Sequence, residues 1–332
     1  MVVRKHQYSR GIALLATMLA VALMTLLVID FTTSAALGYR SAANQADELR
    51  AYYMARSGLA VGLAAIERSA LANSIPPGGG TQPPSSHDSL DQIWARPTPP
   101  IPLDGGFVAV AIVDEDRKIN LSQMYDLRNR RVDPVWGPII ERLLANIGVS
   151  MDVLPVLEDW LDPDGVETPG GAEADYYLKL LPAYEPRNGP MPTIYDLRMI
   201  KGMDDATFIK LMRFCTAQPV KQVNVKTASP EVLAALAPEL ENNVELVKQI
   251  VAAREIEPFT KVTDLVKAVP GLTQIHDFQK LQETLFTVSS SYFTITGEGD
   301  FAGARKRIYS TFKRVPMQPR GAGFLLSNWH ED

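Results

Sequence analysis

The chain has 332 residues, of which 46% are apolar, and its formal net charge at pH 7 is −5. This apolar share suffices for a sizeable core, and the length favours two domains or one domain with an insertion. The negative charge argues against a surface dominated by nucleic-acid binding. Cys215 is the single cysteine, which excludes an internal disulfide.

The first predicted element is a long apolar helix near the N-terminus. The stretch Ile12–Ile29 contains no charged residue, and as a helix it would extend over about 27 Å, enough to cross the hydrocarbon core of a bilayer. No proline follows until Pro76, and apolar residues recur at helical spacing. We therefore expect one helix over residues 12–69 that spans the membrane and continues as the spine of a folded domain.

The charges around this stretch predict its orientation. Arg4, Lys5 and Arg10 precede it, which places the N-terminus in the cytoplasm and everything after Asp30 outside the inner membrane. A cleaved secretory signal peptide is an alternative. The apolar run is longer than the usual hydrophobic region of such a peptide, and no Ala-x-Ala-like cleavage site ends it, so a membrane anchor is favoured.

A basic leader ends at Gly11, and the apolar helix starts at once with Ile12. A plain signal anchor does not explain this glycine. The boundary resembles the leader of type IV prepilins and of type II secretion pseudopilins, which implies that prepilin peptidase removes residues 1–11 and that the new N-terminus is methylated. Glycine suits the cleavage site because it resists helix formation.

The chain departs from the usual prepilin pattern at one position. Most members of that class carry a glutamate five residues after the cut, where this sequence has Ala16. A carboxylate in hydrocarbon is costly and is kept for a function, in this class a pairing with a neighbouring subunit. The pseudopilin that typically lacks the glutamate is the K component of type II secretion systems.

Residues 70–121 are expected to form a linker and the first strands. Proline, glycine and serine dominate residues 76–86, which predicts a loop. The segment Ser89–Ala95 is expected to form a short helical turn with Trp94 packed inward. A β-rich run begins at Phe107, and a second short strand is expected to end near Leu121 after an acidic turn.

Helical periodicity then continues over residues 122–285, which we interpret as an all-helical block. Ser229 followed by proline is typical of a helix N-terminus. The expected helices are Pro134–Ile147, Asp152–Leu161, Thr193–Ile200, Asp204–Phe214, Ser229–Leu236, Asn243–Arg254, Val262–Ala268 and Thr273–Leu285.

Strand patterns return in residues 286–332, which are expected to form a hairpin and a tail. The predicted strands are Phe286–Thr296 and Ala304–Val315, joined by a turn through Gly297–Gly303. Two strand groups far apart in sequence most simply form one sheet. The predicted fold class is α+β: a long N-terminal membrane-spanning helix packed on a small antiparallel sheet, with a large all-α inserted domain.

Three segments of the helical block carry a more specific resemblance. Glu158–Leu180 contains EDWLDPDG and GGAEADYY, and Tyr184–Met203 and Val223–Leu236 follow it in order. These segments are similar to segments of the K components of type II secretion systems. The resemblance implies the pseudopilin fold and a minor pseudopilin that caps the pseudopilus tip with I- and J-type partners, in contact with other pseudopilins and the inner-membrane platform.

Acidic side chains gather in the first of these segments. Hard oxygen ligands on irregular backbone suit calcium, although the spacing is not that of an EF-hand, and a solvated acidic loop remains open. The resemblance implies calcium in the helical domain, and the candidate ligands are Asp162, Asp164, Glu173 and Asp175, with Glu167 nearby.

Two further functions are compatible with parts of the sequence. A minor pilin of a type IV pilus would share the leader and the spine. A membrane-tethered DNA-uptake protein would use Asp196–Met203 and Asp264–Leu272, which resemble helix-hairpin-helix motifs that hold phosphate at a glycine turn. Such hairpins are also a compact way to pack short helices, and without a basic stripe we favour packing.

Catalytic motifs are lacking in the sequence. None of the four histidines forms an H-E-x-x-H pair, and the sequence contains neither G-x-S-x-G nor a Walker A motif. We expect a protein that acts by assembly and is not an enzyme.

Overall fold

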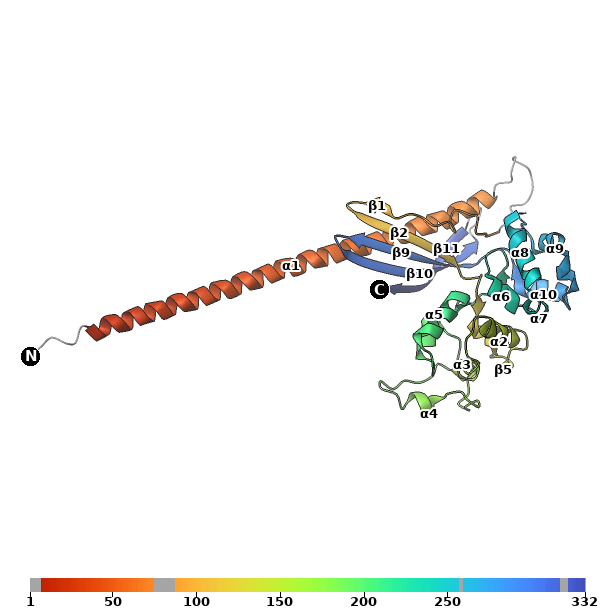
Figure 1. Ribbon diagram of the computed structural model, residues 1–332, viewed down its shortest axis with the longest axis horizontal. Coiled ribbons are helices and arrows are strands. Elements are labelled where there is room, and N and C mark those ends of the chain that lie inside the picture. Colours follow the sequence, from red (N-terminus) through yellow and green to blue (C-terminus); the bar gives the residue numbers. More distant parts are fainter. Residues whose placement is uncertain (1–6, 75–86, 257–258, 317–321, 332) are drawn as a thin grey trace, which may run out of the picture.

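The structure is a computed structural model that describes residues 7–74, 87–256, 259–316 and 322–331. Its longest element is helix α1, Gln7–Ser74, which confirms the predicted continuous helix. Its 68 residues extend over about 100 Å. Figure 1 shows α1 projecting from the rest of the molecule, with the N-terminus at its far end.

From Gly11 to Ala46, α1 is not covered by any other described part of the chain. Residues 11–46 are exposed, and Ile12 and Leu19 expose 69% and 72% of their surface. Within the described residues, α1 is the one helix that is long and apolar enough to cross a membrane. An apolar surface of this extent requires lipid or other apolar helices around it.

Five strands form one antiparallel sheet in the order β1-β2-β9-β10-β11. The C-terminal half of α1 covers one face, where its Leu59 and Ile66 join Phe293, Ile295 and Ile308 in a common apolar core. This is the predicted helix-on-sheet fold (Figure 1). The strands are Ile101–Leu103 (β1), Gly106–Asp114 (β2), Tyr292–Phe301 (β9), Ala304–Pro316 (β10) and Ala322–Glu331 (β11).

The predicted glycine turn of the C-terminal hairpin is wrong. Gly297 and Gly299 lie inside β9 and face α1, and the actual turn is Ala302-Gly303, with φ values of 51° and 87°. A Cβ on Gly297 would overlap the carbonyl oxygen of Ala55, and one on Gly299 would overlap the carbonyl oxygen of Ala51. These glycines let the helix backbone approach the strand, a use that a turn pattern in the sequence does not reveal.

The two edge strands of the sheet lay outside the sequence prediction. β1 joins β2 through Asp104-Gly105, whose φ values of 45° and 85° suit a two-residue hairpin. The tail forms β11, which pairs with β10 along its whole length and shifts register once near Thr311. The short strand predicted before Leu121 exists as Ile119–Asn120 (β3), but it pairs with a strand of the insertion and not with this sheet.

The insertion runs between the end of β2 and the start of β9. Its helices are Trp136–Asn146 (α2), Val153–Leu161 (α3), Ala174–Tyr177 (α4), Asp205–Phe214 (α5), Pro230–Ala235 (α6), Pro238–Glu241 (α7), Val244–Ile256 (α8), Val262–Ala268 (α9) and Phe278–Leu285 (α10), with 3-10 helices Leu121–Met124 (η1), Ile194–Met199 (η2) and Pro270–Gln274 (η3). Each predicted helix is found to within a few residues, although the last one is divided and Thr193–Ile200 is a 3-10 helix, whereas α4, α7 and η1 were not predicted.

The insertion is mostly helical and not all-helical as predicted. Short strand pairs tie its segments together: β3 with Cys215–Thr216 (β6), Tyr125–Asp126 (β4) with Arg131–Val132 (β5), and Val223–Asn224 (β7) with Phe286–Thr287 (β8). The predicted strand from Phe286 is therefore wrong at its start, because residues 286–287 belong to the insertion and β9 begins at Tyr292. Two-residue strands produce no alternation that a sequence could display.

Only part of the predicted linker lies within the described residues. The loop expected over residues 76–86 lies outside the described residues. Ser89–Ala95 forms consecutive turns and no helix, but Trp94 is buried as predicted and meets Phe293 edge-on, with ring centroids 5.3 Å apart. The indole anchors the loop after α1 to the sheet.

We predict that Gly297→Ala destabilises the protein by about 3 kcal/mol, because the added methyl group forces α1 and β9 apart. Urea unfolding of the full chain in detergent micelles measures the change. The control is Gly165→Ala, where a Cβ meets no atom within 4 Å, with an expected change within about 0.5 kcal/mol. Equal unfolding free energies for the two variants would contradict this account of the interface.

Candidate functional site

The structure brings three acidic side chains of the insertion together. Asp159 lies in the last turn of α3, Asp162 follows that helix as its C-cap, and Glu173 precedes α4. One carboxylate oxygen from each lies within 4.8 Å of the other two. All three residues are buried, and buried carboxylates require compensation by hydrogen bonds or by a cation.

Hydrogen bonds compensate these carboxylates only in part. The backbone N–H of Thr168 donates to both oxygens of Asp159, at 3.1 and 3.3 Å. Both oxygens of Glu173 and the Oδ1 atom of Asn188 are buried and have no hydrogen-bond partner within the described residues. Gly171 leaves room for the cluster, because a Cβ there would overlap the Asp159 carboxylate.

The electrostatics of the cluster point to a missing positive charge. Burial, with the neighbouring Asp164 carboxylate as the next cause, raises the pKa of Asp162 to about 6. Burial and then Asp162 raise the pKa of Glu173 to about 7. The donor set consists of hard oxygens on a loop and two helix ends, which fits calcium.

Some of the predicted calcium ligands lie in the acidic cluster and others do not. Asp162 and Glu173 lie in the cluster, whereas Asp175 and Glu167 are exposed and lie outside it. Asp164 lies near Asp162, but its Oδ1 accepts a hydrogen bond from the Val166 N–H at 3.0 Å. Loop composition could not separate these acids, because only the folded loop decides which of them turn inward.

Asp159 is the ligand candidate that the sequence analysis missed. It precedes Asp162 by three positions, a spacing that places both side chains on one face of a helix end. The signal was therefore present in the string EDWLD. The helix was predicted to end at Leu161, as α3 does, so this spacing could have been interpreted from the sequence.

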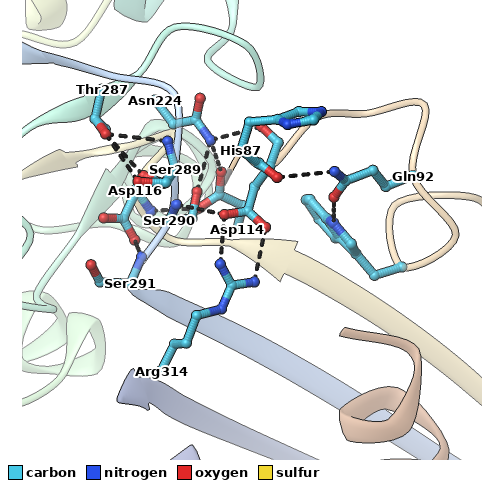
Figure 2. Close-up of polar contacts among 12 residues, drawn as sticks. His87, Gln92, Asp114, Asp116, Asn224, Thr287, Ser289, Ser290, Ser291 and Arg314 are labelled. Atoms are coloured by element: carbon cyan, nitrogen blue, oxygen red, sulfur yellow. Dashed lines mark hydrogen bonds and ion pairs between the residues drawn. The ribbon is translucent and has the colours of Figure 1, made fainter. Parts of the chain in front are cut away.

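A second buried polar cluster joins the insertion to the sheet (Figure 2). The guanidinium of Arg314, on β10, makes two parallel bonds to the carboxylate of Asp88, at 2.7 and 2.8 Å. The backbone N–H of Ser290 donates to the same carboxylate at 2.7 Å. The loop after α1, the sheet and the end of the insertion therefore meet at one ion pair.

Asn224 connects this cluster to the middle of the insertion. Its side-chain amide donates to the Asp88 carbonyl at 3.1 Å, to Asp114 at 3.3 Å and to the Ser290 hydroxyl at 2.8 Å. The Thr227 hydroxyl donates to Asp114 at 2.5 Å. Three of these contacts link residues more than a hundred positions apart, so they fix where the insertion sits.

Asp114 and Asp116 mark the point where the chain leaves the sheet for the insertion. One Asp116 oxygen accepts from the backbone N–H groups of Ser291 and Tyr292, at 2.9 and 2.8 Å. Burial is the main cause that raises the pKa of Asp114, to about 6. The two ends of the insertion are thereby held side by side by hydrogen bonds to carboxylates.

The predicted leader site lies within α1. The sequence analysis expected the helix to start at Ile12, but α1 begins at Gln7 and continues through Gly11 and Ile12. A Cβ at Gly11 would meet no atom within 4 Å, so packing does not explain this glycine. Ala16 is exposed on the same helix, in the part that no other described part of the chain covers.

Comparisons with known proteins agree on one family. Two family models, each described as type II secretion system protein K, match residues 117–220 and 223–289. A type II secretion system protein K from Pseudomonas aeruginosa is 32% identical over 311 residues, which cover 92% of this chain and 88% of that protein. The chain belongs to the protein K family of type II secretion systems.

Two further relatives extend this finding. Protein K from Klebsiella pneumoniae is 31% identical over 268 residues, which cover 76% of this chain and 77% of that protein. A chain of the crystal structure of the GspK–GspI–GspJ complex from enterotoxigenic Escherichia coli matches with a TM-score of 0.69 at 21% identity, over 88% of this chain and 99% of that chain. That match shows the shared fold.

Membership of the protein K family removes the two alternative functions. The matched ranges lie within the insertion, which a minor pilin of a type IV pilus does not require. The helix-hairpin-helix lookalikes pack inward, as favoured from the sequence: Leu197 and Ile200 of the first, and Leu265 and Leu272 of the second, are buried in the core of the insertion. The coarse function is therefore that of a secretion-system component.

We predict that Arg314→Met destabilises this protein K by about 3–5 kcal/mol, because it leaves the Asp88 carboxylate buried without its cation. Asp88→Asn combined with Arg314→Met should recover part of the loss. Urea unfolding of the full chain in micelles measures both variants.

The control for this prediction is Arg305→Met, which breaks an ion pair to Asp300 whose arginine is 63% exposed. Its expected cost is at most about 1 kcal/mol. Equal costs for the buried and the exposed arginine would show that the junction cluster does not hold the insertion in place.

Proposed function

We propose that this protein K is the minor pseudopilin that assembles with I- and J-type pseudopilins at the tip of the pseudopilus and supports the export of folded proteins across the outer membrane. The observation that carries the proposal is the likeness over 88% of the chain to a chain of the GspK–GspI–GspJ complex. Membership of the protein K family supports it independently.

The shape of the molecule supports a position at the end of a filament. Figure 1 shows the insertion beyond the sheet, at the end of the molecule farthest from the N-terminus of α1. Subunits that repeat along a filament stack their α1 helices with an axial offset. The mass of the insertion would occupy the space of the next subunit in that direction, so this chain suits a position with no subunit beyond it.

Ala16 supports the same position from within the membrane. A methyl side chain cannot form the charge pairing that a glutamate makes with the N-terminal amine of a neighbouring subunit. This subunit therefore lacks one of the contacts by which further subunits are added to the filament. The α1 helix can still pack on neighbouring pseudopilin helices through its exposed apolar surface.

The same helix anchors the protein before assembly. Its apolar residues suit one crossing of the inner membrane, with the basic residues before Gly11 in the cytoplasm and the folded domain in the periplasm. Prepilin peptidase would cut between Gly11 and Ile12. Because glycine costs a helix about 1 kcal/mol relative to alanine, Gly11 lowers the cost of unwinding the first turns for cleavage.

The proposed role is assembly without catalysis. The buried polar groups of the junction and of the acidic cluster hold segments of the chain together, which suits a structural role. Further expected contacts are with other pseudopilins and with the inner-membrane platform of the secretion system.

We propose that calcium binds the acidic cluster as a structural ion. Asp159, Asp162 and Glu173 would hold it, since their buried carboxylates approach one another and neither Glu173 oxygen has a hydrogen-bond partner in the part of the chain that the structure describes. When bound, the ion supplies the positive charge that offsets the repulsion between these carboxylates. It would thereby fix the loop between α3 and α4.

We predict that 1 mM calcium raises the thermal midpoint of the full chain, with a stabilisation of about 2.7 kcal/mol if the ion is present at one hundred times its Kd. Glu173→Gln should remove this increase. Without calcium the variant should be at least as stable as the original chain, because an amide removes a buried negative charge.

The matched control for calcium is Asp175→Asn, two positions away and exposed, which should keep the full response. Differential scanning calorimetry with calcium and with EDTA measures all three proteins. An equal response of Glu173→Gln and Asp175→Asn would overturn the proposed site.

We predict that the full chain in micelles forms a 1:1:1 complex with the I- and J-type pseudopilins of its own system. Size-exclusion chromatography with multi-angle light scattering measures the mass, and each binary mixture serves as a control. Three separate elution peaks at 10 µM of each protein would contradict the tip assignment. This assay does not depend on the calcium site, which Glu173→Gln tests separately.

A further inference from the structure

A cavity of about 520 Å³ lies between the sheet and the insertion, on the face of the sheet opposite α1. Thr294 and Thr296 form part of its floor, because they alternate along β9 with Ile295, which packs toward α1. Tyr195 and Phe214 of the insertion form part of its walls. Ligand sites in proteins have about this volume and often lie where two structural units meet.

Two arginines of the cavity lining make no ion pair within the described residues, although the charges of Asp114 and Glu115 lie near Arg117. Arg117 is half-buried and lines the cavity, and among the described residues its guanidinium has no hydrogen bond and no ion pair. Burial lowers the pKa of Arg117, the nearby Asp114 carboxylate offsets part of this shift, and the charge of Arg213 adds to it. Lys118 also lines the cavity, but it is already paired with Glu115 at 3.1 Å.

Arg213 is the second of these arginines. Its guanidinium lies over the Phe214 ring, 5.3 Å from the centroid, and it has no acidic partner among residues 7–74, 87–256, 259–316 and 322–331. One half-buried guanidinium, Arg117, and one at the exposed edge of the cavity, Arg213, favour an anion, and a carboxylate matches their planar donor geometry.

The rest of the lining is apolar with scattered amide and hydroxyl groups. Ile194, Met212 and Val232 offer apolar contact. Gln218 accepts a hydrogen bond from the Ser327 hydroxyl at 2.9 Å, which leaves its NH₂ group to donate. The side chain of Thr296 makes no hydrogen bond in the described part of the chain. Free donors and acceptors between apolar surfaces suit peptide amides better than a hydrocarbon tail.

We propose that this cavity binds a short peptide segment whose carboxylate is held by Arg117 and Arg213 and whose adjacent apolar side chain packs against Met212 and Val232. The peptide amides then bond to Gln218 and Thr296. The site lies away from the acidic cluster and from α1, and it requires neither calcium nor the tip complex. The insertion would then bind a ligand in addition to blocking the addition of further subunits.

The test uses the full chain in lipid nanodiscs with methyl-labelled methionine, and Met212→Leu assigns the Met212 signal. The probes are acetyl-Leu-Phe with a free carboxylate, the same dipeptide as its amide, and decanoate. The expected result is a saturable shift of the Met212 signal with the free acid, a submillimolar Kd that weakens with added salt, and binding of the amide that is at least about tenfold weaker.

Arg117→Met should weaken binding of the free acid by about tenfold or more. Arg305→Met, which removes an exposed arginine outside the cavity, should leave it unchanged. If Arg117→Met fails to fold, binding of the free acid is measured with Arg213→Met. Arg213 is exposed, so its loss does not open the core.

Three results would overturn the proposal. One is no shift of Met212 with 10 mM free acid, and another is equal binding of the acid and the amide. The third is tighter binding of decanoate than of the dipeptide acid, which would assign the cavity to a lipid-like ligand. The 1:1:1 complex with I- and J-type pseudopilins can form under any of these results, so failure here leaves the tip assignment intact.

Discussion

The close contact between α1 and strand β9 is the constraint on which the rest of this structure depends. Gly297 and Gly299 remove the side chains that would separate helix and strand, so backbone meets backbone and the flanking apolar residues close around it. That contact joins a helix half exposed for the membrane to a folded sheet. The orientation of the whole folded domain relative to the anchor therefore depends on a few missing Cβ atoms.

The insertion is attached to this frame at one place, and its position follows from buried charge. The Arg314–Asp88 pair and the amide of Asn224 join three parts of the chain that are distant in sequence. Buried polar contacts of this kind contribute more to a single arrangement than to stability, because a shifted insertion would leave charges without partners. A subunit at the end of a filament needs its insertion in a fixed position if the insertion is to block the addition of a further subunit.

Two sites in the insertion carry charged side chains of opposite sign. The cluster of Asp159, Asp162 and Glu173 is negative and closed by burial, which suits a resident cation. The cavity with Arg117 and Arg213 is positive and lies at the junction with the sheet, which suits a ligand that comes and goes. In this interpretation the first site stabilises the insertion and the second gives it something to bind.

The sequence by itself determined the long helix, the helices of the insertion and the protein family, because periodicity, proline positions and local motifs depend on neighbours in the chain. Asp162 and Glu173 could be found as candidate ligands for the same reason. Only the tertiary structure decided that Gly297 serves packing, that the tail forms β11, and that Asp159 replaces Asp175 in the cluster. These features depend on contacts between distant segments, and composition does not encode which side of a loop or strand faces its partner.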